Sequence, residues 1–189
     1  MKKLLLFVFA SLLFGACSKD LEQSGESEKK VYYKSLNEAQ LDYNNDLHLD
    51  LNNDGKEDFN FFVSDDIVRK KLEFRVRTLN GSLLVGAGLA PKVFEKEEVL
   101  QIETNSKYTW TPNNAYLAYR IYTDESTTVW EGAWMNQVNK FMAVKIKSGN
   151  LYYTGWIRIS IGGLQPKLII HDYGYSKIAD SAIKAGATN

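Results

Sequence analysis

The sequence predicts an all-β fold, a single antiparallel β-sandwich, with a β-barrel-like arrangement as the alternative. From Val31 onward, apolar side chains alternate with polar ones at a period of two, the pattern of a strand with one buried face. Turn-forming Gly and Asn residues separate these runs at short intervals, as in antiparallel sandwiches and barrels. No long stretch has the period of about 3.6 residues that marks an amphipathic helix.

Residues 1–16 are predicted to form a signal peptide. Lys2 and Lys3 precede an apolar run over residues 4–16. A helix of that length spans about 20 Å, less than the ~30 Å hydrocarbon core of a bilayer, so it is too short to cross a membrane. A basic start, an apolar middle and small residues at the end are typical of a cleaved signal. The small residues Gly15 and Ala16 stand directly before Cys17, the only cysteine in the chain.

This arrangement resembles the signal and lipobox of bacterial lipoproteins. The resemblance implies that Cys17 becomes the first residue and is acylated on its sulfur and on its new amino terminus. Two or more acyl chains anchor a protein stably, so we expect a protein that is held at a membrane without spanning it. The implied location is the cell envelope, on the surface or periplasmic face of the outer membrane. An ordinary secretory signal with a coincidental cysteine is the alternative.

Residues 17–30 are expected to form a flexible tether, because they contain no aromatic and no β-branched residue that could build a core. Residues 31–189 are then expected to form one β-sandwich domain. The chain has 23 basic and 23 acidic residues, and removal of residues 1–16 takes away two lysines and no acid. The mature chain therefore carries 21 basic and 23 acidic residues. This balance argues against a nucleic-acid partner, which usually requires a basic excess.

Each strand is predicted from the alternation in its own segment. Leucines alternate with Asp and His in residues 47–51, and Phe and Val alternate with other residues in 59–63. Every second residue is apolar in 72–76, and the Asn80-Gly81 pair then predicts a tight hairpin turn into 82–85. Further strands are expected at 116–122, 140–146, 151–161 and 167–173, which makes about eight or nine strands, as in many sandwiches.

The segment 50–58 has the spacing of a calcium loop. Oxygen-bearing side chains stand at its positions 1, 3, 5 and 9, and Gly55 at position 6 permits a sharp turn. Calcium prefers such hard oxygen ligands. Phe61 stands where an EF-hand has its Glu, and the flanks are predicted strands, so the loop is not an EF-hand. The expected ligands are the side chains of Asp50, Asn52, Asp54 and Asp58 and the carbonyl of Lys56.

A metal-free turn is the alternative for the same segment, because Asn and Asp bond to their own backbone and Gly accepts a positive φ. If calcium binds, its role is expected to be structural, fastening the turn between two strands.

Other candidate sites are less well defined. Trp156 and Arg158 alternate along one predicted strand and could form a binding face, with tryptophans stacking on sugar rings; core packing is the alternative. His48 and His171 are the only histidines, too few for a typical zinc site. No serine stands in a nucleophile-elbow pattern, so no catalytic residue is nominated.

Two further stretches resemble secreted bacterial β-rich proteins of uncharacterised function. These stretches are the Gly155-Trp156-Ile157-Arg158 run and the Asp172-Tyr173-Gly174-Tyr175 run near the C-terminus, and the loop of 50–59 is similar to one found near the start of those proteins. The resemblance implies an extracytoplasmic β-rich fold and supports the loop, but it implies no activity.

The expected function is that of a membrane-anchored extracytoplasmic lipoprotein. We expect a non-enzymatic binding or structural module with a structural calcium loop and with a glycan or an envelope protein as partner. The alternative is a glycan-active hydrolase or a carbohydrate-binding component.

Overall fold

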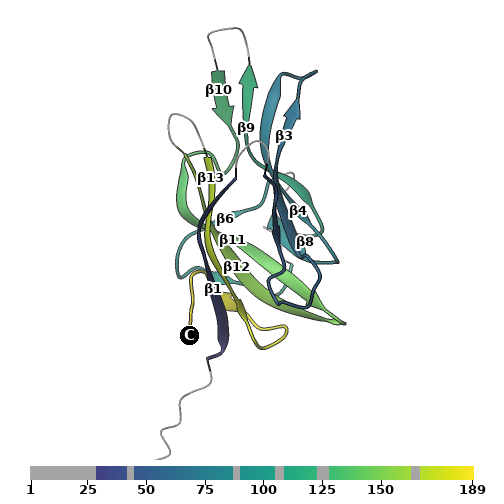
Figure 1. Cartoon of the computed structure of the whole chain (residues 1–189). Coiled ribbons are helices and arrows are strands. Elements are labelled where there is room, and N and C mark those ends of the chain that lie inside the picture. Colours follow the sequence, from purple (N-terminus) through teal and green to yellow (C-terminus); the bar gives the residue numbers. More distant parts are fainter. Residues whose placement is uncertain (1–28, 42–44, 87–89, 105–108, 123–127, 163–166) are drawn as a thin grey trace, which may run out of the picture.

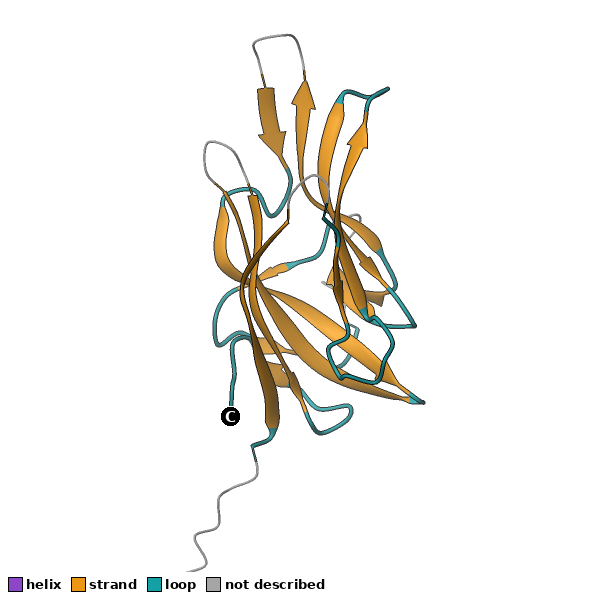
Figure 2. Cartoon of the chain, viewed as in Figure 1, coloured by secondary structure: helices purple, strands orange, loops and turns teal. Residues whose placement is uncertain are grey.

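A computed structural model describes residues 29–41, 45–86, 90–104, 109–122, 128–162 and 167–189. The predicted all-β fold is confirmed: these residues form antiparallel sheets, none closed into a barrel, and contain no helix (Figures 1 and 2). No helix in the described ranges is long and apolar enough to cross a membrane. The predicted signal peptide, Cys17 and most of the tether lie outside the described residues.

Sheet A, the larger sheet, forms one layer of the sandwich. Its central strands are the long hairpin partners β11 and β12, and its outer strand β1 pairs with β13. In order across the sheet, the strands are β1 (Val31–Leu41), β13 (Lys167–Ser176), β12 (Leu151–Gly162), β11 (Gln137–Ser148), β5 (Leu83–Gly86) and β8 (Thr109–Thr111), with β6 (Val93–Phe94) paired to β11.

Sheet B forms the facing layer; its strands β3 and β4 lie on the right of Figure 1, and β9 and β10 stand at the top. Its centre is the β3–β4 hairpin, and the predicted Asn80-Gly81 turn follows β4, with positive φ at both residues. In order, the strands are β10 (Thr128–Glu131), β9 (Asn114–Tyr122), β4 (Lys71–Thr78), β3 (Phe59–Asp66) and β2 (Leu47–Leu49).

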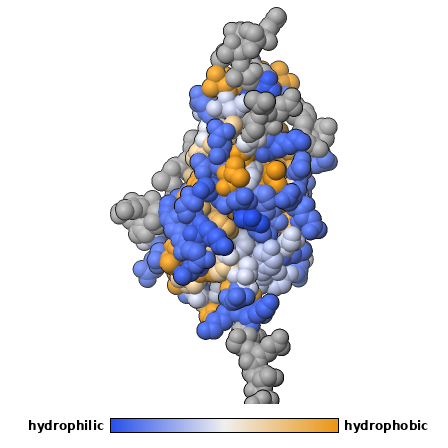
Figure 3. Space-filling view, turned by 90° about the vertical axis from the view of Figure 1, so that its left-hand side faces the viewer, coloured by the Kyte–Doolittle hydropathy of each residue, from blue (hydrophilic) through white to orange (hydrophobic). Residues whose placement is uncertain are grey.

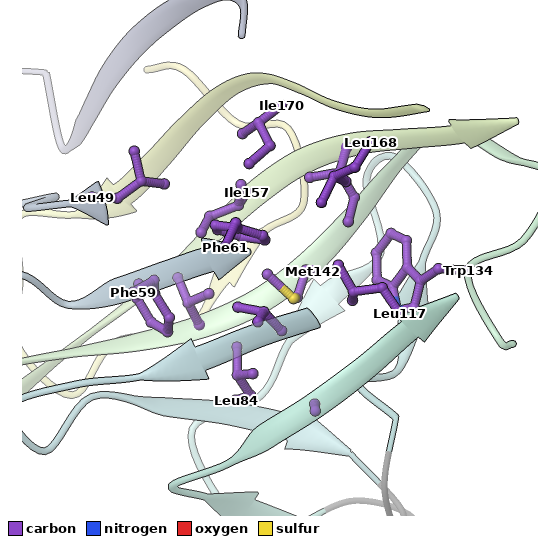
Figure 4. Close-up of a cluster of buried hydrophobic side chains, with 14 of the residues drawn as sticks. Leu49, Phe59, Phe61, Leu84, Leu117, Trp134, Met142, Ile157, Leu168 and Ile170 are labelled. Atoms are coloured by element: carbon purple, nitrogen blue, oxygen red, sulfur yellow. The ribbon is translucent and has the colours of Figure 1, made fainter. Parts of the chain in front are cut away.

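The main core lies between the two sheets. The inward residues of β3 are Phe59 and Phe61, and they are fully buried against the isoleucines of β12, as the alternation predicts (Figure 4). Trp134, which follows β10, closes one end of this core and donates its indole N–H to the carbonyl of Pro91 at 3.0 Å. The fully buried members from sheet A include Met142, Val144, Ile146, Ile157, Ile159 and Ile161.

A second, smaller core lies on the opposite face of sheet A. There, a two-stranded sheet of β7 (Val99–Leu100) and β14 (Ile183–Lys184) covers Phe141 and Trp156. Sheet A is therefore buried on both faces in this region, and the domain has a third layer that the sequence pattern did not predict. The C-terminus ends close to this layer, at the lower left of Figure 1.

Three neighbouring strand pairs of sheet A each contain a register shift, and the three shifts lie side by side in one row across the sheet. The register shifts between Ser35 and Ala39 in β1, between Arg158 and Ile159 in β12, and between Gln137 and Lys140 in β11. The partner residues show that the shifts are adjacent, since Ile170 is opposite both Ala39 and Ile159, and Ile159 is opposite Lys140. Asn37, Glu38 and Asn139 have positive φ in this row. Bulges of this kind re-aim side chains and are frequent near functional sites.

Candidate functional site

The predicted calcium loop connects β2 to β3, and its side chains turn inward onto its own backbone. The two carboxylate oxygens of Asp50 accept hydrogen bonds from the amides of Asp54 and Gly55, at 3.2 and 2.8 Å. Asn52 Oδ1 accepts from the amide of Asp54 at 3.1 Å, and Asp54 Oδ1 accepts from the amide of Lys56 at 2.9 Å. Gly55 has a φ of 82°, as a sharp turn at this position requires. The spacing thus brings Asp50, Asn52 and Asp54 around one short turn.

Asp58 has a different environment from the other three side chains. It is 3% exposed, and its oxygens accept hydrogen bonds from the amide of Leu51 at 2.9 Å and from the hydroxyl of Ser82 at 2.8 Å. Burial raises the pKa of its carboxyl, while these two hydrogen bonds act in the opposite direction. Asp58 therefore fastens the loop to the β4–β5 turn.

The oxygen donors of the loop fit the chemistry of calcium, but they are engaged with backbone amides. Among the described residues, no group of three or more His, Cys, Asp or Glu side chains is arranged to hold a metal ion. A calcium ion would take oxygens of Asp50, Asn52 and Asp54 and the carbonyl of Lys56, in exchange for some of the amide contacts. Asp58, the fourth expected side-chain ligand, would also have to give up its bond to Leu51 or to Ser82. The ligand set therefore stays a prediction.

Tyrosines of sheet A hold the other side of the loop. Tyr173 donates its hydroxyl hydrogen to the carbonyl of Leu51 at 3.3 Å, and Asn53 donates its side-chain amide to the hydroxyl of Tyr32 at 3.5 Å. Together with the Asp58–Ser82 bond, these contacts attach the loop to both layers of the sandwich.

A row of aromatic rings continues from this contact along sheet A. Tyr32 stacks on Tyr175, with ring centroids 5.1 Å apart, and Tyr153 meets Tyr175 edge-on at 6.5 Å. Burial raises the pKa of the Tyr175 hydroxyl and of the Tyr173 hydroxyl, so both phenols stay protonated and can donate and accept hydrogen bonds.

Two hollows adjoin the loop, and a third lies next to one of them. The first, which we call the tyrosine hollow, measures about 280 Å³ and lies between the loop and the tyrosine row. The second measures about 270 Å³ and shares Asp54 with the first; the third measures about 520 Å³ and shares Lys177 with it. The tyrosine hollow is lined by Asn52, Asp54, Ser148, Tyr153, Tyr175 and Lys177.

The predicted binding face of Trp156 and Arg158 is divided between two environments. Trp156 is 1% exposed, meets Phe141 edge-on at 5.4 Å, and donates its indole N–H to the carbonyl of Ala187 at 3.2 Å. It is part of the second core, because β7 and β14 cover this face of sheet A. Trp156 is therefore not available for stacking on a ligand in this structure.

Arg158 lies at the row of bulges and forms a two-pronged ion pair with buried Asp172. Its Nε and Nη2 donate to the two carboxylate oxygens at 2.9 and 2.6 Å, and its Nη1 donates to Asn139 at 3.1 Å. Tyr33 donates its hydroxyl hydrogen to Asp172 at 3.0 Å. The hydrogen bond to Asp172 raises the pKa of Arg158 above its already high value, so the guanidinium stays charged.

The same row brings His171 next to Ser160. Ser160 Oγ lies 2.7 Å from His171 Nε2, and His171 Nδ1 lies 3.8 Å from a carboxylate oxygen of Glu38. Burial lowers the pKa of His171, and the charge of Arg158 lowers it further, which favours the neutral ring. Ser160 Oγ also accepts the amide hydrogen of Asn139 at 2.8 Å. The remaining histidine, His48, contacts Glu57 and Asn60 at the edge of sheet B.

No family model matches the chain, and no curated protein or solved structure matches it either. The fold and these side-chain arrangements are therefore the basis for any statement about function.

Sequence reasoning did not predict the tyrosine hollow. Its residues come from three segments that are distant in the sequence, namely the loop, the β11–β12 hairpin and the end of β13. The one feature of the sequence that pointed to this region is the Tyr173-Gly174-Tyr175 spacing, which places the rings of Tyr173 and Tyr175 on the same face of a strand.

Proposed function

We propose that the protein is a lipid-anchored component of the cell envelope, most consistent with the outer membrane, and that its β-sandwich is a non-enzymatic binding module. The N-terminal pattern that ends at Cys17 supports the anchor. The observation that carries the binding role is the loop of residues 50–58, which is fastened to both sheets and borders two hollows, one of which shares Lys177 with a third hollow.

The same loop supports a structural calcium ion as the cofactor. Asp50, Asn52 and Asp54 already converge on one turn through their bonds to shared amides. Two of these side chains are carboxylates, and their mutual repulsion would fall when a divalent cation binds between them. A bound ion would then fix the border of the adjoining hollows.

Calcium titration tests this proposal. Calcium at about 100 times its dissociation constant stabilises a protein by about 2.7 kcal/mol, which corresponds to a rise in melting temperature of roughly 5–10 °C for a chain of this size. We expect this rise for the parent chain and its loss in Asp54→Ala. Glu103→Gln, which removes an exposed carboxylate outside the loop, is the matched control and should keep the rise. A parent chain whose melting temperature ignores calcium would contradict the metal site.

The anchor is tested separately by fractionation of cells. Cys17→Ser removes the only thiol that could accept a lipid, so the protein should move from the membrane fraction to a soluble fraction. Continued membrane association of this variant would show that Cys17 is not the anchor.

One observation favours an enzyme as the second candidate, namely the contact of Ser160 with His171 at 2.7 Å. Three features weigh against it. Ser160 is 7% exposed, the Nδ1–Glu38 distance of 3.8 Å is longer than a hydrogen bond, and neither Ser160 nor His171 lines any of the three hollows described above. The binding module is therefore the better supported function.

A further inference from the structure

The tyrosine hollow combines ring surfaces with polar groups of both kinds. Half-buried Tyr153 and Tyr175 contribute aromatic carbon, and the edge-on contact between their rings holds them in a fixed orientation. Asn52 adds an amide from the loop, and Ser148 adds a hydroxyl from the end of β11. Rigid aromatic side chains lose little conformational entropy when a ligand binds, so a ready-made ring surface favours recognition.

The charges at this hollow nearly cancel. Without calcium, Asp54 contributes one negative charge and the exposed Lys177 one positive charge. A phosphate or a polyanion would then meet a carboxylate in this hollow, and a cationic ligand would meet an ammonium group. Calcium bound by Asp50 and Asp54 would balance these two carboxylates and leave Lys177 as the single charge of the lining. The lining therefore fits a neutral ligand that has many hydroxyl groups and an apolar face.

The volume of the hollow limits the size of the ligand. Its volume of about 280 Å³ is at the small end of ligand pockets, which hold roughly 300–1,000 Å³. This is room for a single ring-sized unit. The third hollow shares Lys177 and is bordered by Tyr32 and Tyr33, so a longer chain could continue along the same edge.

We propose that the tyrosine hollow binds one neutral pyranose unit at the end of a glycan. The apolar face of the sugar packs against Tyr153 and Tyr175, and its hydroxyl groups bond to Asn52, Asp54 and Lys177. This inference rests on the binding role proposed above and names its ligand class. Calcium in the loop strengthens the interaction indirectly, because Asn52 and Asp54 belong both to the loop and to the hollow.

A glycan array tests the inference with the lipidated full chain in detergent and with calcium present. The array carries glycans that end in neutral hexoses or N-acetylhexosamines, and glycans that end in uronic acids or sulfated sugars. We expect binding to the first group. Tyr153→Leu should weaken it roughly tenfold or more, equivalent to about 1.4 kcal/mol. Tyr152→Leu is the matched control, since the adjacent side chain points to the other face of β12, near Lys145, and this variant should bind like the parent.

A second pair of variants avoids any effect on folding. Lys177→Ala changes an exposed side chain of the hollow and should weaken binding, whereas Lys34→Ala changes an exposed lysine of β1 outside it and should not. Equal binding by Tyr153→Leu and Tyr152→Leu, with both folded, would overturn this site, as would binding to the anionic glycans alone. A silent array would overturn the sugar as ligand. If the array is silent but calcium still raises the melting temperature of the same protein, the sugar ligand is rejected and the calcium loop is retained. The failure of this inference is therefore distinguishable from the failure of the proposed calcium site.

Discussion

Asp172 carries a carboxylate that is almost fully buried in sheet A, and two neighbouring side chains donate hydrogen bonds to it. Arg158 supplies two parallel N–H donors, and Tyr33 supplies a hydroxyl donor. Only a guanidinium presents two donors in the fork geometry that matches a carboxylate. The side chain of Arg158 is 32% exposed, so water stabilises its outer part while its inner part neutralises Asp172.

Removal of Arg158 should therefore destabilise the domain strongly. Arg158→Ala leaves a buried charge with one hydroxyl donor, and loss of one partner of a buried pair costs about 3–5 kcal/mol. Because Arg158 is partly exposed, we expect about 3 kcal/mol, or roughly 6–12 °C in melting temperature. Arg69→Ala is the control, since Arg69 is 77% exposed and pairs with Asp66 at the surface, where such pairs contribute about 0–1 kcal/mol. Equal losses in the two variants, measured by urea unfolding, would contradict this account of Asp172.

At the scale of elements, alternation of apolar and polar residues predicted β3 and β4. The strands β11, β12 and β13 were predicted from apolar runs bounded by turn residues, and parts of β11 and β12 are buried on both faces. The sequence pattern did not locate β1. The edge position of β1 allows polar residues such as Lys34 and Gln40, and its bulge at Asn37 and Glu38 interrupts the period of two.

The candidate loop was predictable for a similar reason, because Asp50, Asn52 and Asp54 are brought together by local turn chemistry. The inward turn of Asp58 was not predictable, since its partner Ser82 is 24 residues away and reaches it only through the packing of the β4–β5 turn. The tyrosine hollow depends in the same way on tertiary contacts.

The turn between β10 and β11 gives a prediction at this scale. Gly132 has a φ of 122°, and a Cβ there would lie 2.6 Å from the carbonyl oxygen of Leu117, which accepts the amide hydrogen of Trp134. Gly132→Ala should therefore displace Trp134 and lower the melting temperature clearly. Gly149 also has a positive φ, of 60°, but it lies in the left-handed helical region and has open space around its Cβ, so Gly149→Ala should cost only backbone strain of about 1–2 kcal/mol. If Gly132→Ala were no worse than Gly149→Ala, the contact with Leu117 would not limit this turn.

At the scale of the whole molecule, the domain is a two-layer sandwich with a partial third layer. The main core explains why the sandwich is stable without disulfides, since large aromatic and aliphatic side chains fill the space between the sheets. The third layer explains why β12 is apolar on both faces, with Ile157 turned to sheet B and Trp156 turned to β7 and β14. The surface on the left-hand side of Figure 1 is mainly hydrophilic, with small separate apolar patches (Figure 3).

The third layer should contribute measurably to stability although it is short. Ile183 of β14 is 6% exposed and packs in the second core, and Ala185 exchanges backbone hydrogen bonds with Glu97 and Glu98 at 2.9 Å. Loss of a buried isoleucine side chain costs about 2–5 kcal/mol, and the lower end applies because neighbours in a thin layer can close the gap. Ile183→Ala should therefore reduce the free energy of unfolding by about 2 kcal/mol in urea. Ile178→Ala removes the same atoms from a side chain that is 51% exposed, and a change within about 0.5 kcal/mol is expected there. Equal effects of the two substitutions would mean that the C-terminal segment lies against sheet A without stabilising it.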